Sequence, residues 1–109
     1  MEITVKPGKG RGNRKVAIGG EMTIYAAAAG KDKLLDALDG ADALEIDLSE
    51  VVEMDTAGVQ LLVLLRREAL SARKPMSLSG HSPAVLEVFD RYGLAAFFGD
   101  TAVIREGKS

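Results

Sequence analysis

The 109-residue sequence contains no cysteine, no tryptophan and a single histidine, His81. Without cysteine there can be no disulfide framework, thiol nucleophile or thiolate metal site. A single histidine excludes a histidine cluster for zinc and a histidine-based catalytic relay. No apolar run approaches the roughly 20 residues of a membrane helix, and the N-terminus has no core of signal-peptide length. We therefore expect a soluble, cytoplasmic, non-enzymatic protein that holds no metal or other cofactor.

Charge is small in total and uneven along the chain. The formal net charge is −2, and lysine and arginine crowd the first segment, at Lys6, Lys9, Arg11, Arg14 and Lys15. Neither occurs from Leu34 to Leu65, where the acidic residues are Asp36, Asp39, Asp42, Glu45, Asp47, Glu50, Glu53 and Asp55. An acidic face argues against a nucleic-acid partner and allows a protein partner with a basic face. The alternative is a solvated face without a partner.

Hydropathy patterns predict alternating strands and helices. Period-two alternation predicts strands at residues 2–6, 15–20, 43–48 and 76–78, and a last short strand at 96–98. Three- and four-residue spacing predicts helices at 23–38, 57–73 and 82–92, with a bend or break at Gly30 and a loop at 49–54. We expect one α/β domain over residues 1–109, with a disordered tail at 105–109. Its mixed, mostly parallel sheet should have four to five strands, packed with three to four helices.

Three glycines in the segment PGKGRGNR (Gly8, Gly10 and Gly12) invite comparison with a phosphate-binding loop. Such a loop lies between a strand and a helix, whereas a strand is predicted to follow this one. No Lys-Ser/Thr pair closes the motif. We interpret the segment as a flexible hairpin tip. His81 lies beside Ser82 at a predicted helix start, and no third group is near in sequence to complete a catalytic relay.

The stretch EVVEMDTAGVQLLVLLRREA places Asp55, Thr56 and Gly58 between acidic residues and an apolar helix. Asp55 or Thr56 can cap that helix, as Thr23 can cap the first one. Gly58 leaves the first turn bare, so that another surface could approach the backbone. A phosphate on Thr56 would lie at the positive end of the helix dipole, near free N–H groups, and would repel a docked partner. A plain helix cap is the alternative.

The helix that follows is apolar around nearly its full circumference in the first two turns, at Val59, Leu61, Leu62, Val63, Leu64 and Leu65. A surface helix normally needs only an apolar stripe. Burial of the whole set is the commoner outcome, and an exposed remnant for a partner is the alternative. Any such remnant would lie near Thr56, because charged residues return from Arg66 onward.

The segment DLSEVVEMDTAGVQLLVLL resembles the signature of STAS domains, the family of sulfate-transporter C-terminal domains and anti-sigma factor antagonists. The family pattern is a strand ending in Asp-Leu-Ser, then an apolar residue, Asp, Ser or Thr, a small residue, Gly and an apolar helix. Residues 47–49 and 54–59 match it in order. GHSPAVLEVFDRYGLAAFF and Gly20-Glu21-Met22 resemble two further family segments. The resemblance implies a SpoIIAA-like fold over nearly the whole chain.

In the anti-sigma antagonist branch, the hydroxyl residue after the aspartate is phosphorylated by a serine kinase that is itself the anti-sigma factor. The resemblance therefore implies Thr56 as the phosphoacceptor and such a kinase as the partner. It also implies a switch loop and partner interface formed by Met22, Thr23, Met54, Asp55, Ala57, Gly58 and Val59. Neither nucleic-acid binding nor membrane insertion is expected.

One departure from the sporulation-type pattern leaves a second function open. Those antagonists typically carry two serines where this chain has Thr56 and Ala57. The Asp-Thr-Ala-Gly form also resembles STAS subunits of lipid-transport ATP-binding cassette complexes and small STAS proteins of chemotaxis signalling. The alternative is therefore a constitutive subunit of a larger assembly, without phosphorylation.

Overall fold

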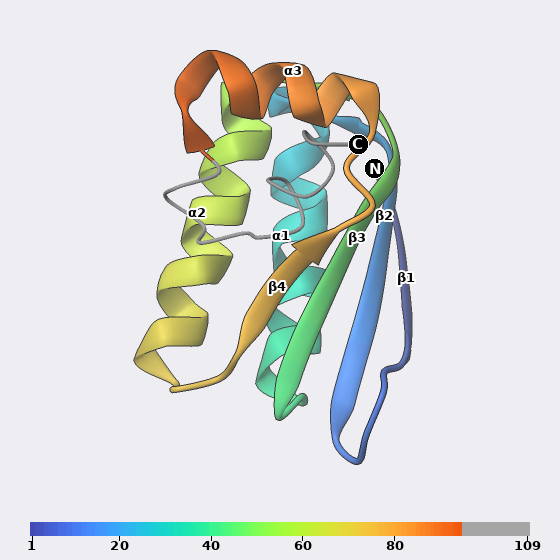
Figure 1. Cartoon of the computed structure of the whole chain (residues 1–109), viewed down its shortest axis with the longest axis vertical. Helices are drawn as coiled ribbons and strands as arrows, with labels where there is room; N and C mark the ends of the chain where they lie inside the picture. Colours follow the sequence, from blue (N-terminus) through green and yellow to red (C-terminus); the bar gives the residue numbers. More distant parts are fainter. Residues whose placement is uncertain (95–109) are drawn as a thin grey trace.

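The computed structural model describes residues 1–94, which form one α/β domain (Figure 1). Its strands are β1 (Glu2–Pro7), β2 (Asn13–Met22), β3 (Ala43–Met54) and β4 (Met76–Ser79). Its helices are α1 (Ile24–Asp39), α2 (Thr56–Ser71) and α3 (Pro83–Tyr92). The predicted order of elements and the predicted fold class are confirmed. The strand predicted at 96–98 and the tail predicted at 105–109 lie outside the described residues.

The four strands form one sheet in the order β1-β2-β3-β4. β1 pairs with β2 in an antiparallel hairpin, whereas β2, β3 and β4 are mutually parallel. The helical connections explain this arrangement, because parallel neighbours require a crossover of about a dozen residues or more. As a result, β2 and β3 both begin at the hairpin end of the sheet and finish at its opposite end.

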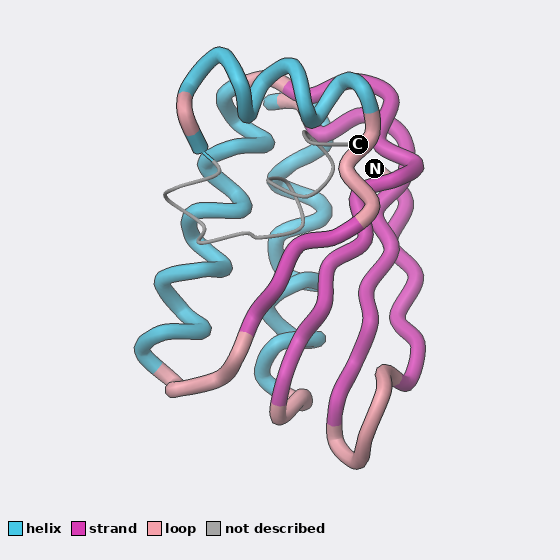
Figure 2. The backbone as a smooth tube through the Cα atoms, in the orientation of Figure 1, coloured by secondary structure: helices cyan, strands magenta, loops and turns pink. Residues whose placement is uncertain are grey.

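The helices cover one face of the sheet. α1 and α2 lie side by side along it, and α3 crosses the end at which β2 and β3 finish (Figures 1 and 2). The buried strand residues on this face include Val16, Ile18, Leu44, Ile46, Leu48 and Leu78. On the other face, Lys15 Nζ lies 3.7 Å from Glu45 Oε2, and Ser79 Oγ donates to the same oxygen at 2.7 Å. The sheet therefore has one apolar face and one polar face.

β3 is longer than predicted, because residues 49–54 continue the strand instead of forming a loop. Ala17 pairs with Asp47 but Gly19 with Glu50, and Gly20 pairs with Val51 but Glu21 with Glu53. Each shift places one extra residue in β3, which is a β-bulge. The bulges interrupt the two-residue alternation, so the next buried positions are Val51 and Met54. The prediction of a loop at residues 49–54 was wrong, because it assumed that a strand always shows period-two alternation.

α1 runs without the predicted bend at Gly30, which is buried under the N-terminal strand. A Cβ at Gly30 would lie 2.6 Å from Met1 Sδ and 3.2 Å from Ile3 Cδ1. Glycine there permits close packing of helix on strand rather than a break in the helix.

The two ends of α1 are stabilised by side chains from distant parts of the chain, since its own first and last turns carry no complementary charges. Lys74 Nζ donates to Leu38 O at 2.8 Å and to Asp39 O at 2.7 Å. Arg14 Nη1 donates to Ala37 O at 3.4 Å. These cations meet the negative end of the helix dipole. The positive end meets a carboxylate, which belongs to the candidate site.

Candidate functional site

Asp55 lies between the end of β3 and the start of α2, and both of its carboxylate oxygens accept backbone hydrogen bonds. Oδ1 accepts from Ala57 N at 2.8 Å and from Gly58 N at 3.3 Å, which caps α2. Oδ2 accepts from Ile24 N at 3.0 Å, which caps α1. One carboxylate thus satisfies donors at the N-termini of two helices, where negative charge is favourable.

Thr23 stands at the N-cap position of α1, but its side chain makes no capping hydrogen bond. The sequence-based expectation that Thr23 caps this helix was wrong, because Asp55 supplies the acceptor instead. Of the two residues proposed to cap α2, Asp55 is the one that does so.

Thr56 is the first residue of α2, and it is exposed. It follows Asp55 directly, so its side chain leaves the backbone beside the junction of α1 and α2. The sequence suggested that free N–H groups here could receive a phosphate. That expectation needs correction, because Asp55 already occupies the N–H groups of Ala57 and Gly58. An anion on Thr56 would therefore be a second negative group next to the capping carboxylate, accessible from outside.

Gly58 is buried, and the surface that approaches it belongs to the protein itself. A Cβ on Gly58 would collide with the carbonyl oxygen of Met22 and lie 3.0 Å from Met22 Cβ. The same carbonyl accepts a hydrogen bond from Asp55 N at 3.2 Å. Glycine at this position therefore lets the first turn of α2 pack against the end of β2. The expectation of a bare turn open to a partner was wrong here.

The residues that the sequence grouped as a switch loop and interface do lie around one junction, but they differ in exposure. Met22, Thr23, Met54 and Gly58 are buried, so they lie beneath the exposed surface of the site. Asp55, Ala57 and Val59 are half-buried, and Thr56 is exposed. Only the second group offers side-chain surface to a partner.

Two exposed apolar residues at the same junction were missed by sequence reasoning. Ile24 and Tyr25 open α1, with 66% and 95% of their surface accessible. The hydrogen bond from Ile24 N to Asp55 Oδ2 fixes them beside the start of α2. At the same end of the sheet, Val52 is 70% exposed. The run Thr23-Ile24-Tyr25 directly after a strand is a weak sign of an exposed apolar site, because the same run also fits the buried apolar stripe of a helix.

A groove of about 200 Å³ continues from this junction between α1 and α2. Its apolar lining comes from Ala27, Ala28, Ala57, Leu61 and Leu64, with Lys31 and Gln60 at its polar positions. Leu61, Leu62 and Leu65 are buried in the core, whereas Val59, Val63 and Leu64 are only half-buried, so the expected burial of the whole set was wrong. A remnant stays accessible in the groove. We call Ile24, Tyr25, Thr56 and the groove the junction surface.

Other candidate chemistry finds little support in the described residues. The glycine-rich segment leads into β2 and not into a helix, as predicted. Within residues 1–94, no group of three or more His, Cys, Asp or Glu side chains could hold a metal ion. His81 is buried and packs edge-on against Phe89, with ring centroids 5.4 Å apart. In the same residues, no helix has the length and apolar character needed to cross a membrane.

Comparison with known proteins gives one family and a consistent fold. A family model described as "Mlab, STAS domain" matches residues 8–104. No curated protein gives a significant sequence match. Among solved structures, an anti-sigma factor antagonist from Mycobacterium paratuberculosis is 26% identical, with a TM-score of 0.73 over 89% of this chain and 83% of that one.

Two solved structures of SpoIIAA, one unphosphorylated and one phosphorylated, are also similar to this chain. The anti-sigma factor antagonist SpoIIAA in its unphosphorylated form is 22% identical, with a TM-score of 0.71 over 87% of this chain and 84% of that one. The Bacillus cell fate determinant SpoIIAA in its phosphorylated form is 21% identical, with a TM-score of 0.67 over 87% and 86%. At this identity the likeness establishes the fold, which is the one that the sequence predicted.

Proposed function

The chain belongs to the STAS domain family, and we propose that it is a docking module whose binding to a protein partner is switched by phosphorylation of Thr56. The partner is a serine kinase of the anti-sigma factor type. The proposal places the protein in the bacterial cytoplasm, where such a kinase has ATP, and gives it no catalytic role. It takes residues 1–109 as one STAS domain, which the family match to residues 8–104 supports.

The observation that carries the proposal is the position of Thr56. It is exposed at the first turn of α2, next to a carboxylate whose oxygens both serve helix N-termini. A kinase can therefore reach the hydroxyl without unfolding the domain. The phosphate adds about −1.5 to −2 charges without entering the core. A related antagonist, SpoIIAA, occurs in unphosphorylated and phosphorylated forms, which supports the same chemistry here.

The surroundings of Thr56 explain how a phosphate would act. Ile24, Tyr25 and the groove give the junction surface an apolar character. A partner that covers them also covers Thr56, and burying a dianion among apolar side chains is costly unless the partner supplies a paired cation. Phosphorylation would therefore weaken an apolar contact directly, by desolvation, while leaving the fold unchanged.

Partner binding tests this proposal. Affinity purification of the tagged chain from its native cells identifies the partner, and titration then compares Thr56→Glu with Thr56→Ser. We expect Thr56→Glu to bind at least about thirtyfold more weakly, equivalent to roughly 2 kcal/mol. Thr56→Ser keeps the hydroxyl and should bind like the unaltered chain. Equal affinity of Thr56→Glu and the unaltered chain would exclude the switch.

The apolar groove also favours the second candidate function, a constitutive subunit of a transporter ATPase or a chemotaxis-associated assembly. Permanent interfaces are more apolar than transient ones, and the groove provides such a surface next to Thr56. In that case Thr56 contributes only an interface hydrogen bond. The distinguishing result is the absence of phosphate on Thr56 in cells, together with a partner that co-purifies stoichiometrically.

A further inference from the structure

The β1–β2 hairpin concentrates positive charge at one end of the domain. Residues 3–20 contain no acidic side chain, but they contain Lys6, Lys9, Arg11, Arg14 and Lys15. Lys6, Lys9 and Arg11 are exposed, and within residues 1–94 no carboxylate forms an ion pair with them. The other two are engaged, Arg14 with the end of α1 and Lys15 with Glu45 and Asp47. We call Lys6, Lys9 and Arg11 the hairpin cations.

Backbone hydrogen bonds hold the hairpin tip, which carries Lys9 and Arg11, while Lys6 lies at the end of β1. Gly8 N donates to Asn13 O at 2.7 Å, and Asp42 N donates to Gly12 O at 2.8 Å. The Asn13 side chain donates to Lys9 O. Gly10 and Gly12 have φ values of 89° and 78°, which glycine adopts without strain. The backbone of the tip is thus a closed loop anchored to the connection between α1 and β3.

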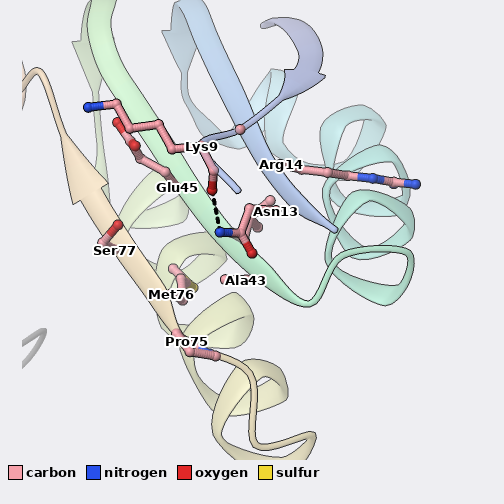
Figure 3. Close-up of a pocket in the computed structure, with 10 residues that line it drawn as sticks. Lys9, Asn13, Arg14, Ala43, Glu45, Pro75, Met76 and Ser77 are labelled. Atoms are coloured by element: carbon pink, nitrogen blue, oxygen red, sulfur yellow. Dashed lines mark hydrogen bonds between the residues drawn. The ribbon is translucent and has the colours of Figure 1, made fainter. Parts of the chain in front are cut away.

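The hairpin cations are exposed and do not converge on one pocket, since Lys9 lines a cavity behind the tip and Lys6 lines a different one beside α1. A cavity of about 240 Å³ opens behind the tip, between the starts of β2, β3 and β4. Figure 3 shows Arg14 extending from it toward α1, while Lys9 extends to the opposite side. The lining of this cavity also includes Asn13, Glu45 and Ser77. This arrangement suits an extended anionic surface better than a small enclosed phosphate.

The hairpin tip and the junction surface lie at opposite ends of the sheet (Figure 1). β3 connects the two ends with 12 residues, and the steps between them, at about 3.3 Å each, give a separation of roughly 36 Å. A surface bound at the tip would therefore leave Thr56 accessible. Among neighbouring groups, Lys33 adds an exposed cation, whereas Asp36 and Asp42 offset part of the charge.

We propose that the hairpin cations bind the surface of an anionic phospholipid bilayer and orient the domain with Thr56 facing away from it. The inference goes beyond the proposed function and does not depend on phosphorylation. The chemistry fits a flat surface, because the tip projects from the sheet and has no apolar side chain in residues 8–12 to insert. Nucleic acid fits less well, since residues 1–24 contain no aromatic side chain on which a base could stack.

The attraction between the hairpin cations and the bilayer is electrostatic, and the contribution of each cation is small. Each lysine or arginine near an anionic leaflet strengthens partitioning about fivefold, so three cations contribute about a hundredfold. That is enough to hold a domain whose partner is itself at the membrane, where the local concentration is high. It is insufficient for stable anchoring alone.

Vesicle co-sedimentation of the full chain tests the proposal. The probes are vesicles of pure phosphatidylcholine and vesicles with about one-third phosphatidylglycerol, at low salt. We expect binding only to the anionic vesicles. The double variant Lys9→Gln/Arg11→Gln should bind about 25-fold more weakly. The matched control Lys31→Gln/Arg67→Gln removes two exposed cations from α1 and α2 and should bind like the unaltered chain.

Several outcomes would overturn the proposal. If the tip variant and the control variant bind the anionic vesicles equally, the effect comes from net charge alone. If the chain binds both vesicle types equally, or binds neither, it does not recognise the anionic surface. Displacement by inorganic phosphate at constant ionic strength would indicate a small anion site instead. Tip-dependent binding to single-stranded DNA that is tighter than binding to vesicles would indicate nucleic acid. Circular dichroism confirms that each variant is folded.

Discussion

Asp55 holds Ile24 across 31 residues of sequence, because the Asp55 Oδ2 accepts a hydrogen bond from the Ile24 N–H at 3.0 Å. The other carboxylate oxygen caps α2, so one side chain sets the relative position of two helix N-termini. Thr56 and the exposed Ile24 and Tyr25 are arranged around that carboxylate. The geometry of the proposed switch therefore depends on a residue that is not itself modified.

Replacing Asp55 with alanine should destabilise the domain by about 2 kcal/mol, because helix caps are worth about 1 kcal/mol each and two are lost. Urea denaturation measures the loss. Asp55→Asn keeps one acceptor oxygen for α2 but presents an amide to Ile24 N, so it should lose about half as much.

The matched control for Asp55→Ala is Ser82→Ala. Ser82 Oγ accepts from Val85 N at 3.3 Å and caps α3 alone. Its removal should cost about 1 kcal/mol. If Asp55→Ala and Ser82→Ala cost the same, the double cap contributes no more than a single one, and the account of the junction is wrong.

Gly58→Ala should destabilise the domain although alanine is the better helix former. The added Cβ meets the backbone carbonyl of Met22, which cannot move without shifting β2. Overpacking of this kind costs about 1–3 kcal/mol, which outweighs the gain of about 1 kcal/mol in helix propensity. Thermal unfolding provides the measurement.

Gly30→Ala serves as the comparison, because its Cβ would meet the side chains of Met1 and Ile3, the first of them long and flexible. The collision and the propensity gain should nearly cancel, leaving a change within about 1 kcal/mol. A Gly58→Ala protein more stable than the unaltered chain would show that the close packing against β2 is not required.

Lys74→Met should destabilise α1 by about 1 kcal/mol, because the ammonium group binds the carbonyls of Leu38 and Asp39 at the negative end of the helix dipole. The effect should shrink in high salt, which screens charge interactions. Lys31→Met removes an exposed cation from the middle of the same helix and should change stability by less than about 0.5 kcal/mol. Equal losses would exclude the capping role.

Tyr25→Ala should leave stability within about 0.5 kcal/mol of the unaltered chain, because the side chain is 95% exposed. It should nevertheless weaken partner binding about tenfold or more, since exposed tyrosines at interfaces are frequent hot spots. Leu70→Ala, at the opposite end of α2 and 62% exposed, is the control. Partner affinity that falls equally in both variants would place the contact elsewhere.

The sequence predicted most of the fold, because its strands and helices keep regular apolar spacing and clear end signals. Ser82 and Pro83 start α3 as predicted, and Gly93 ends it with a φ of 64°. The end of β3 escaped prediction, since two bulges break the alternation through Glu50 and Glu53. A bulge depends on the neighbouring strand, so its signal is not local.

The site was predicted only in part, because some of its contacts join segments that are far apart in the sequence. The motif around Asp55 and Thr56 identified the junction, and local capping of α2 follows from spacing. The hydrogen bond to Ile24 joins residues far apart in the chain, so no pattern within a single segment indicates it. Likewise, the burial of Gly58 against Met22 arises from the packing of α2 on the end of β2.

The central claim, that Thr56 is the phosphorylated switch of this domain, is tested most directly by phosphopeptide mapping of the intact protein from its native cells. The account predicts a single phosphate on Thr56 in a fraction of molecules that changes with growth condition. It also predicts that partner-bound protein is depleted in that form. Thr56 that stays unmodified under every condition, with the partner bound throughout, would contradict the switch and favour a constitutive subunit.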